Sequence, residues 1–224
     1  MKYIIANWKA NKNSTEVQEW ITNFTMQLQS NEMIMNKLQN NAVSLIICPP
    51  FPFIQLMKPL ENLAPNIKIG AQTISSFVEG AYTGEVTAKS LQGMVNYAII
   101  GHSERRSHFA ETDETLALRV KNAKDQSIEP VFCIRGTEDA IPAGATMIAY
   151  EPVEAIGTGM NMPSAQVSEK KKVFTLPPGC LFIYGGSVND QTAQEYLINT
   201  DIDGLLIGGA SLKPESFIAI AAKA

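Results

Sequence analysis

The stretch Tyr97-Ala-Ile-Ile-Gly-His-Ser-Glu104 carries the pattern that decides the fold, a short apolar run that gives way at once to glycine and polar residues. The run does not alternate between polar and apolar residues, which is typical of a strand covered on both faces. Seven further runs of this kind occur, at 3–6, 43–48, 67–70, 131–134, 147–150, 181–184 and 205–207. The sequence therefore predicts eight buried strands.

Segments with the spacing of amphipathic helices lie between most of these runs. The clearest apolar stripe consists of Val17, Ile21, Phe24 and Leu28. A capping-box pattern of Thr15 and Gln18 marks its start. Six more helical segments are predicted, at 52–63, 87–95, 112–126, 163–174, 189–199 and from 214 to the C-terminus.

This alternation of strand and helix, with right-handed crossovers, predicts an α/β fold with a parallel sheet, either closed as a barrel or open and doubly wound. Eight strands in roughly 205 residues favour a single closed (β/α)8 barrel, known as a TIM barrel. No GxGxxG motif follows the first run, which removes the usual reason to prefer a dinucleotide-binding fold.

The interval between the fifth and sixth strands departs from the alternation of strand and helix. Only residues 135–145 lie there, and they include Gly136, Pro142 and Gly144. A full crossover helix does not fit, and at most one helical turn near 137–140 is expected. The predicted barrel therefore has seven substantial helices, with the helix after strand 5 shortened or missing.

Composition indicates one globular domain over residues 1–224. Of the 224 residues, 45% are hydrophobic and 18% are charged, which permits a sizeable core, and no linker is evident. The formal net charge is −4, and no basic run is long enough to follow a nucleic-acid backbone. The lysines at 170–172 are interpreted as the solvated face of a helix.

The three cysteines, Cys48, Cys133 and Cys180, lie in apolar, strand-like segments without a CxxC motif. We interpret them as buried free thiols, which suggests a reducing compartment. The apolar N-terminal stretch is too short for a signal peptide or a membrane span, so a cytoplasmic protein with no membrane partner is expected.

Polar and glycine residues follow the predicted strands at the end where barrel enzymes place their active sites. These residues are Asn7 and Lys9; His102, Ser103 and Glu104; Glu151; Gly185, Gly186 and Ser187; and Gly208 and Gly209. Taken singly, a lysine is usually solvated, a histidine structural and a glycine pair a tight turn. Their position at one end of successive strands favours an active site, with the last two glycine turns suited to a phosphate.

The stretch from Glu151 to Gly159 looks like a catalytic carboxylate followed by a lid. Pro152 stiffens one end and the glycines at 157 and 159 free the other, while apolar residues between them could exclude water from a ligand. The alternative is an ordinary strand-to-helix loop.

Taken together, these residues and the stretches around them resemble the triosephosphate isomerase family, and the resemblance extends along nearly the whole chain. The matching stretches are Ala-Asn-Trp-Lys at 6–9, Cys-Pro-Pro-Phe at 48–51, Gly-Ala-Gln at 70–72, Gly-Ala-Tyr-Thr-Gly-Glu at 80–85, Ile-Gly-His-Ser-Glu-Arg-Arg at 100–106, Ala-Tyr-Glu-Pro-Val at 149–153, Ala-Ile-Gly-Thr-Gly at 155–159, Tyr-Gly-Gly-Ser-Val at 184–188 and Gly-Leu-Leu-Ile-Gly-Gly-Ala at 204–210. The joint order and spacing of these stretches is highly specific.

The resemblance implies an aldose–ketose isomerase of glycolysis and gluconeogenesis that interconverts dihydroxyacetone phosphate and D-glyceraldehyde 3-phosphate through an enediolate. It implies Glu151 as the base, His102 as the neutral electrophile and Lys9 as the stabilising cation. Triosephosphate isomerase is itself a standard example of such acid–base tuning and of lid closure, so these roles rest on the resemblance.

The resemblance assigns supporting roles to further residues. Glu104 matches a carboxylate near the lysine, and Asn7 and Trp8 match pocket residues. The backbone donors to the substrate phosphate match Gly157, Ser187, Gly208 and Gly209. No metal and no organic cofactor is expected, because the hydrogen moves as a proton within one molecule.

The resemblance also implies a homodimer, in which the loop at 72–85 inserts into the partner and Thr83 reaches the partner's active site. Phe77, Val78 and Tyr82 support this interpretation independently, since exposed apolar loop residues often mark an interface.

Three features depart from the family pattern. Glu154 replaces a tryptophan at the first lid hinge, Arg135 replaces a glycine after the fifth strand, and the helix that should follow that strand is largely deleted. Two alternatives stay open: another barrel isomerase or lyase acting on a phosphorylated metabolite, and a catalytically silent barrel used as a scaffold.

Overall fold

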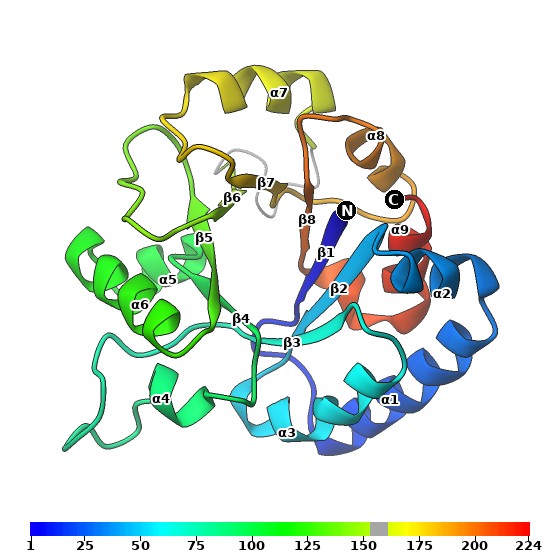
Figure 1. The fold of residues 1–224 in the computed structure, drawn as a ribbon, viewed down its shortest axis with the longest axis horizontal. Helices are drawn as coiled ribbons and strands as arrows, with labels where there is room; N and C mark the ends of the chain where they lie inside the picture. Colours follow the sequence, from blue (N-terminus) through cyan, green and yellow to red (C-terminus); the bar gives the residue numbers. More distant parts are fainter. Residues whose placement is uncertain (153–160) are drawn as a thin grey trace.

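The computed structural model describes residues 1–152 and 161–224, in which eight parallel strands close into a barrel in sequence order (Figure 1). The strands are β1 (Lys2–Asn7), β2 (Val43–Cys48), β3 (Ile67–Ala71), β4 (Tyr97–Ile100), β5 (Glu129–Ile134), β6 (Met147–Tyr150), β7 (Leu181–Tyr184) and β8 (Gly204–Ile207). All eight predicted runs are confirmed, with ends within two residues of those expected.

The barrel closes between β1 and β8, where Tyr3 pairs with Gly204 and Ala6 with Ile207. Gly204 is required at this seam, because a Cβ atom there would lie 2.1 Å from the backbone oxygen of Tyr3.

Successive residues of each strand face opposite sides of the barrel wall. In β5, Val131 and Cys133 belong to the inner cluster that fills the barrel, whereas Phe132 and Ile134 belong to the outer cluster under the helices. All four are fully buried. Burial on both faces explains why the strands read as continuous apolar runs.

The described part of the chain contains nine α-helices around the barrel (Figure 1). They are α1 (Ser14–Gln29), α2 (Glu32–Gln39), α3 (Ile54–Met57), α4 (Ala88–Leu91), α5 (Ser103–His108), α6 (Asp113–Asp125), α7 (Ser164–Val173), α8 (Ala193–Leu197) and α9 (Pro214–Ala222).

The predicted cap of the first helix is wrong. The capping box is formed by Asn13 and Glu16: the Asn13 side chain accepts from the backbone N–H of Glu16 at 3.1 Å, and the Glu16 carboxylate accepts from the backbone N–H of Asn13 at 2.7 Å. The helix therefore begins at Ser14, ahead of Thr15, because asparagine is a strong N-cap.

The predicted set of seven helices needs correction as well. The segment 52–63 divides into the 3₁₀ helix η1 (Phe51–Phe53), α3 and the 3₁₀ helix η2 (Lys58–Asn62), because Pro59 lacks the N–H that a continuous α-helix needs. Helices α2 and α5 were not expected. Helix α2 buries Ile34 and Leu38, one turn apart, and α5 begins at the residue after His102.

The connection from β5 to β6 contains no helix in residues 135–146, all of which the structure describes, so this prediction is confirmed. In Figure 1 it runs as a bare loop between α6 and α7. Ala145 is buried in the outer cluster, and Ile141 and Phe174 pack against that cluster. Single side chains therefore cover the part of the wall where a helix is missing.

The cysteines are free thiols, and Cys48 and Cys133 are buried inside the barrel as predicted. Cys180 differs, because it lies in the turn before β7 and is only half-buried.

Candidate active site

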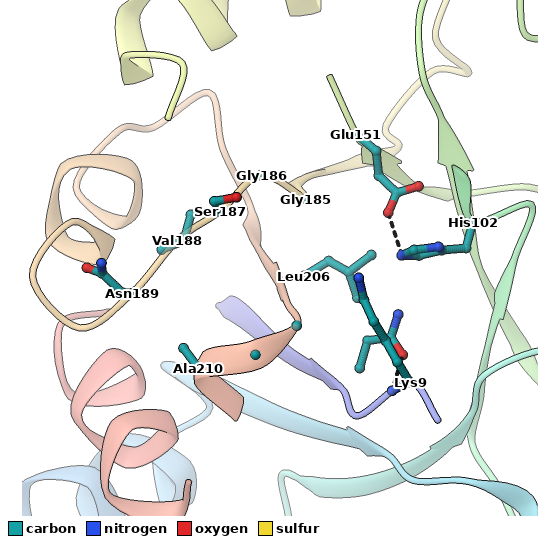
Figure 2. Close-up of a pocket in the computed structure, with 13 residues that line it drawn as sticks. Lys9, His102, Glu151, Gly185, Gly186, Ser187, Val188, Asn189, Leu206 and Ala210 are labelled. Carbon is teal, nitrogen blue, oxygen red and sulfur yellow. Dashed lines mark hydrogen bonds and ion pairs between the residues drawn. The ribbon is translucent and has the colours of Figure 1, made fainter. Parts of the chain in front are cut away.

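A pocket of about 350 Å³ opens at the carboxyl ends of the strands (Figure 2). Its lining consists of Asn7, Lys9, His102, Glu151, Gly185, Gly186, Ser187, Val188, Asn189, Leu206, Gly208, Gly209 and Ala210. Figure 2 shows Glu151, His102 and Lys9 on one side and the turn after β7 on the other. The pocket thus has a side with ionisable groups and a side built largely of backbone turns.

Glu151 directly follows β6, and its carboxylate is almost fully buried, with 2% of the residue exposed. One oxygen accepts a hydrogen bond from the backbone N–H of Ser103 at 2.8 Å, and the other lies 2.8 Å from Nε2 of His102. The thiol of Cys133 also hydrogen-bonds to this carboxylate. Burial and the adjacent carboxylate raise the pKa of that thiol well above its usual range, so it remains protonated and serves as a donor.

His102 is the N-cap of α5, and its Nδ1 accepts a hydrogen bond from the backbone N–H of Glu104 at 3.2 Å. A ring nitrogen that accepts cannot carry the proton, so in the neutral imidazole the proton resides on Nε2. That nitrogen faces Glu151 and the pocket (Figure 2). The helix start thereby fixes the tautomer that can donate into the pocket.

Lys9 has a left-handed backbone conformation with a φ of 52°. This conformation costs a residue with a side chain roughly 1–2 kcal/mol, so neighbouring contacts must hold it in place. The side-chain amide of Gln72 donates to the backbone oxygens of Lys9 at 2.9 Å and of Cys48 at 3.0 Å. The Asn7 side chain accepts from the backbone N–H of Lys9 at 3.1 Å.

The ammonium group of Lys9 lies 2.5 Å from a carboxylate oxygen of Glu104. Glu104 does not line the main pocket but a second cleft of about 340 Å³, shared with Gln72, Thr73 and Phe109. Lys9 lines both cavities. Glu104 can therefore balance the lysine's charge from the side away from the main pocket.

The turns after β7 and β8 contain glycines, which line the pocket with backbone atoms and no side chain. A Cβ atom on Gly209, the first residue of the 3₁₀ helix η4 (Gly209–Leu212), would meet no atom within 4 Å. A Cβ atom on Gly208 would meet Cε of Lys9 at 3.4 Å, so the lysine side chain passes beside this turn. The open space at Gly209 can therefore hold a ligand group beside the cation.

The structure gathers seven predicted site residues around the main pocket: Asn7, Lys9, His102, Glu151, Ser187, Gly208 and Gly209. Trp8 does not line this pocket: its fully buried side chain belongs to the outer cluster, and its ring packs edge-on against Trp20 at 4.8 Å. Its neighbours face the pocket, and residues of an extended chain alternate between two sides. Gly157 and Glu154, with the rest of the expected lid at 153–160, lie outside the described residues.

Sequence reasoning named Ser103 and Gln72 but assigned no supporting contact to either residue. The Ser103 backbone N–H contacts the carboxylate of Glu151, and Gln72 holds the backbone of Lys9. Their position shortly after β4 and β3 was the available signal. The lining residues Val188, Asn189, Leu206 and Ala210 were not predicted either.

Within residues 1–152 and 161–224, no three His, Cys, Asp or Glu side chains gather as a metal site. No helix in these same ranges has the length and apolar character to cross a membrane.

Comparison with known proteins shows similarity along the whole chain. A sequence model described as triosephosphate isomerase matches residues 2–224. The triosephosphate isomerase of Alkaliphilus oremlandii is 35% identical, with 97% of each chain aligned, and that of Mesomycoplasma hyopneumoniae is 37% identical, with 96% of each aligned. The triosephosphate isomerase of Colwellia psychrerythraea is 35% identical over 99% of this chain and 96% of its own. These alignments run over 242 to 258 positions, more than the 224 residues here, so part of each relative has no counterpart in this chain.

Proposed function

This chain belongs to the triosephosphate isomerase family and interconverts dihydroxyacetone phosphate and D-glyceraldehyde 3-phosphate, and we propose that Glu151, His102 and Lys9 carry out the reaction. The observation that supports these roles is the meeting of a buried carboxylate, an imidazole donor and an ammonium group in one pocket.

Glu151 acts as the base on carbon. Its carboxylate removes a proton from C1 of dihydroxyacetone phosphate and returns it to C2, so that one carboxyl group serves as base and then as acid. In the structure, this carboxylate accepts a hydrogen bond from the Ser103 N–H and lies beside Nε2 of His102. The bound substrate must therefore displace the contact with His102 before the carboxylate faces the carbon atoms.

His102 acts on the oxygen atoms. Once released from Glu151, its Nε2–H donates to the carbonyl oxygen, where negative charge develops as C1 loses its proton. To complete the isomerisation, one proton must also leave O1 and one must reach O2. The neutral imidazole, fixed by the Glu104 N–H on its other nitrogen, is placed to relay this proton.

Lys9 stabilises the enediolate and helps to hold the phosphate. Its ammonium group, on a side chain that is 34% exposed, adds positive charge to a pocket partly shielded from solvent, where charges are screened less than in bulk water. The phosphate is placed at the turns of Ser187, Gly208 and Gly209, supported by the open space at Gly209 and by the proximity of Lys9 to Gly208. Backbone N–H groups at such turns are common phosphate ligands in barrel enzymes.

A coupled assay for glyceraldehyde 3-phosphate formation tests these roles. We expect turnover by the purified protein and a loss of about 10²-fold or more in kcat/KM for His102→Gln and for Lys9→Met. Val173→Ala, at an exposed position of α7, is the control and should match the wild type. An inactive wild-type protein, or both variants at full activity, would contradict the assignment.

We also propose a homodimer formed through residues 72–85, with Thr83 close to the partner's active site. Phe77 and Tyr82 are exposed and stack on one another with ring centroids 3.7 Å apart. The connection that carries them extends beyond the ring of helices (Figure 1). The second cleft beside Lys9 is a suitable recess for such a loop.

Sedimentation analysis tests the dimer. We expect the wild-type protein to sediment as a dimer, Tyr82→Asp to sediment as a monomer with reduced turnover, and Val173→Asp to remain dimeric, since that residue is exposed elsewhere on the molecule. A monomeric wild-type protein at micromolar concentration would refute the proposal.

Two broader assignments complete the proposed function. Residues 1–224 are taken as a single domain, supported by the pairing of the first strand with the last. A reducing, cytoplasmic location is supported by three thiols without a disulfide.

A further inference from the structure

We propose that Asp139, in the helix-free connection between β5 and β6, is a positioning residue that holds His102 in place through Arg106. This inference rests on the role proposed above for His102.

Arg106 links the carboxyl ends of two neighbouring strands, β4 and β5. Its Nε donates to the backbone oxygen of Gly101 at 2.9 Å, and one terminal nitrogen donates to the backbone oxygen of Cys133 at 3.3 Å. Gly101 immediately precedes His102, and the thiol of Cys133 contacts Glu151. The Arg106 guanidinium thus sets the spacing between β4, which is followed by His102, and β5, whose Cys133 contacts Glu151.

The Arg106 side chain is only 4% exposed, so its charge needs a counter-ion. Two carboxylates lie near its NH1 nitrogen, Asp113 at 3.2 Å and Asp139 at 3.5 Å. Asp113 is 49% exposed and therefore well screened by water, whereas Asp139 is only 3% exposed. Since charges attract more strongly where water is excluded, Asp139 is the more effective counter-ion despite the longer distance.

Asp139 is itself held firmly by Arg135. It accepts hydrogen bonds from the backbone N–H of Arg135 at 2.7 Å and from the guanidinium at 3.0 and 2.6 Å. Burial opposes its ionisation, yet the bonds from Arg135 and the charge of Arg106 hold the pKa of Asp139 below its usual value. The carboxylate is therefore charged at neutral pH and fixed in orientation.

The shortened connection between β5 and β6 therefore has a second role besides covering the outside of the barrel. Arg135 and Asp139 both lie in the stretch that has lost its helix, and together they supply a fixed negative charge to the arginine that spans β4 and β5. Without that charge, the only carboxylate left to Arg106 among those named is the exposed Asp113, to which NH1 already donates at 3.2 Å, and we expect the guanidinium to shift toward solvent. The backbone at Gly101 and His102 would then lose its support.

The first test compares kcat and KM of the wild type with Asp139→Asn and with the control Glu138→Gln, which removes a charge from an exposed position of the same connection. We expect Asp139→Asn to lower kcat about tenfold with KM within about twofold, because the defect lies in the alignment of a reacting group. The control should keep both constants. Unchanged kcat in folded Asp139→Asn overturns the proposal; if that variant does not fold, Asp139→Glu takes its place with the same expectation.

A double-mutant cycle separates positioning from general destabilisation. In the His102→Gln background, Asp139→Asn should lower kcat by less than about twofold, since no imidazole remains to be positioned. An equal loss in both backgrounds contradicts the proposal.

A third readout does not depend on turnover, so it separates this inference from the proposed function. The chain has two histidines, and the ring ¹⁵N signals of His102 can be assigned by their loss in His102→Gln. Asp139→Asn should shift the His102 signals and leave those of the exposed His108 in place. Unshifted His102 signals refute the inference even if the enzyme is active, whereas an inactive wild type with the expected shift refutes only the proposed function.

Discussion

Gly185→Ala is predicted to displace Glu151, the proposed base, without replacing any ionisable residue. A Cβ atom at this position would lie 3.0 Å from Cγ of Glu151 and 3.3 Å from the backbone oxygen of Tyr150. Ordinary contacts of this kind begin at 3.4 Å, so one or both neighbours must give way by up to about 0.4 Å. The backbone oxygen is part of β6 and cannot yield easily, so most of the displacement falls on the Glu151 side chain.

The size of the effect follows from how tightly that side chain is held. Its carboxylate contacts the Ser103 N–H and His102 at 2.8 Å each, so a shift of its stem is transmitted to the reacting oxygens. Because a misplacement of about 1 Å can cost about 10²-fold in rate, we expect roughly a tenfold loss in kcat, or about 1.4 kcal/mol in the barrier. Overpacking should also cost about 1–3 kcal/mol of unfolding free energy.

The coupled isomerase assay, run beside a thermal unfolding curve, checks both numbers. A fall of roughly 2–4 °C in Tm per kcal/mol is expected for a chain of this size. If kcat stays within twofold of the wild type in a folded protein, Glu151 is less constrained than the geometry implies, and the reasoning fails.

Three further predictions follow from the same geometry. Gly209→Ala should fold normally, because its methyl group meets no atom within 4 Å, and it should raise KM more than it lowers kcat, because that methyl group occupies the proposed phosphate site; an unchanged KM would contradict this. In a thiol titration of the native protein, only Cys180 should react, because the thiols of Cys48 and Cys133 are fully buried inside the barrel whereas Cys180 is partly exposed; three fast thiols would refute it. The pKa of Asp139 is lowered in the folded state, so the stability that its charge contributes is present above the unfolded pKa and is lost as pH falls through the folded pKa. Urea unfolding should therefore show a difference in unfolding free energy between the wild type and Asp139→Asn that is steady from pH 7 to about pH 5 and shrinks below about pH 4.

The strands could be predicted from the sequence because burial on both faces makes each strand a continuous run of apolar residues. Ile99 and Ile100 lie on opposite sides of the barrel wall, and both are fully buried, so the run needs no knowledge of its neighbours to be recognised. The helix-free connection could also be predicted, because Pro142 and two glycines leave too few residues for a helix.

The supporting contacts could not be predicted in this way, because they join residues far apart in the chain. Gln72 reaches Lys9 across 63 positions, and the N–H of Ser103 reaches Glu151 across 48. Trp8 is different, because the alternation of an extended chain is enough to place its side chain in the outer cluster, opposite Asn7 at the pocket. The location of the ionisable groups could thus be predicted, whereas what orients them could not.

The most direct test of the account is the turnover of Glu151→Gln, a substitution that keeps the size of the side chain and removes its ability to accept a proton. With purified protein and dihydroxyacetone phosphate, the account predicts a loss of about 10²–10⁴-fold in kcat relative to the wild type, with an unchanged unfolding temperature to within a few degrees. Undiminished turnover by Glu151→Gln would show that the proton leaves the carbon by another route and would contradict the central claim.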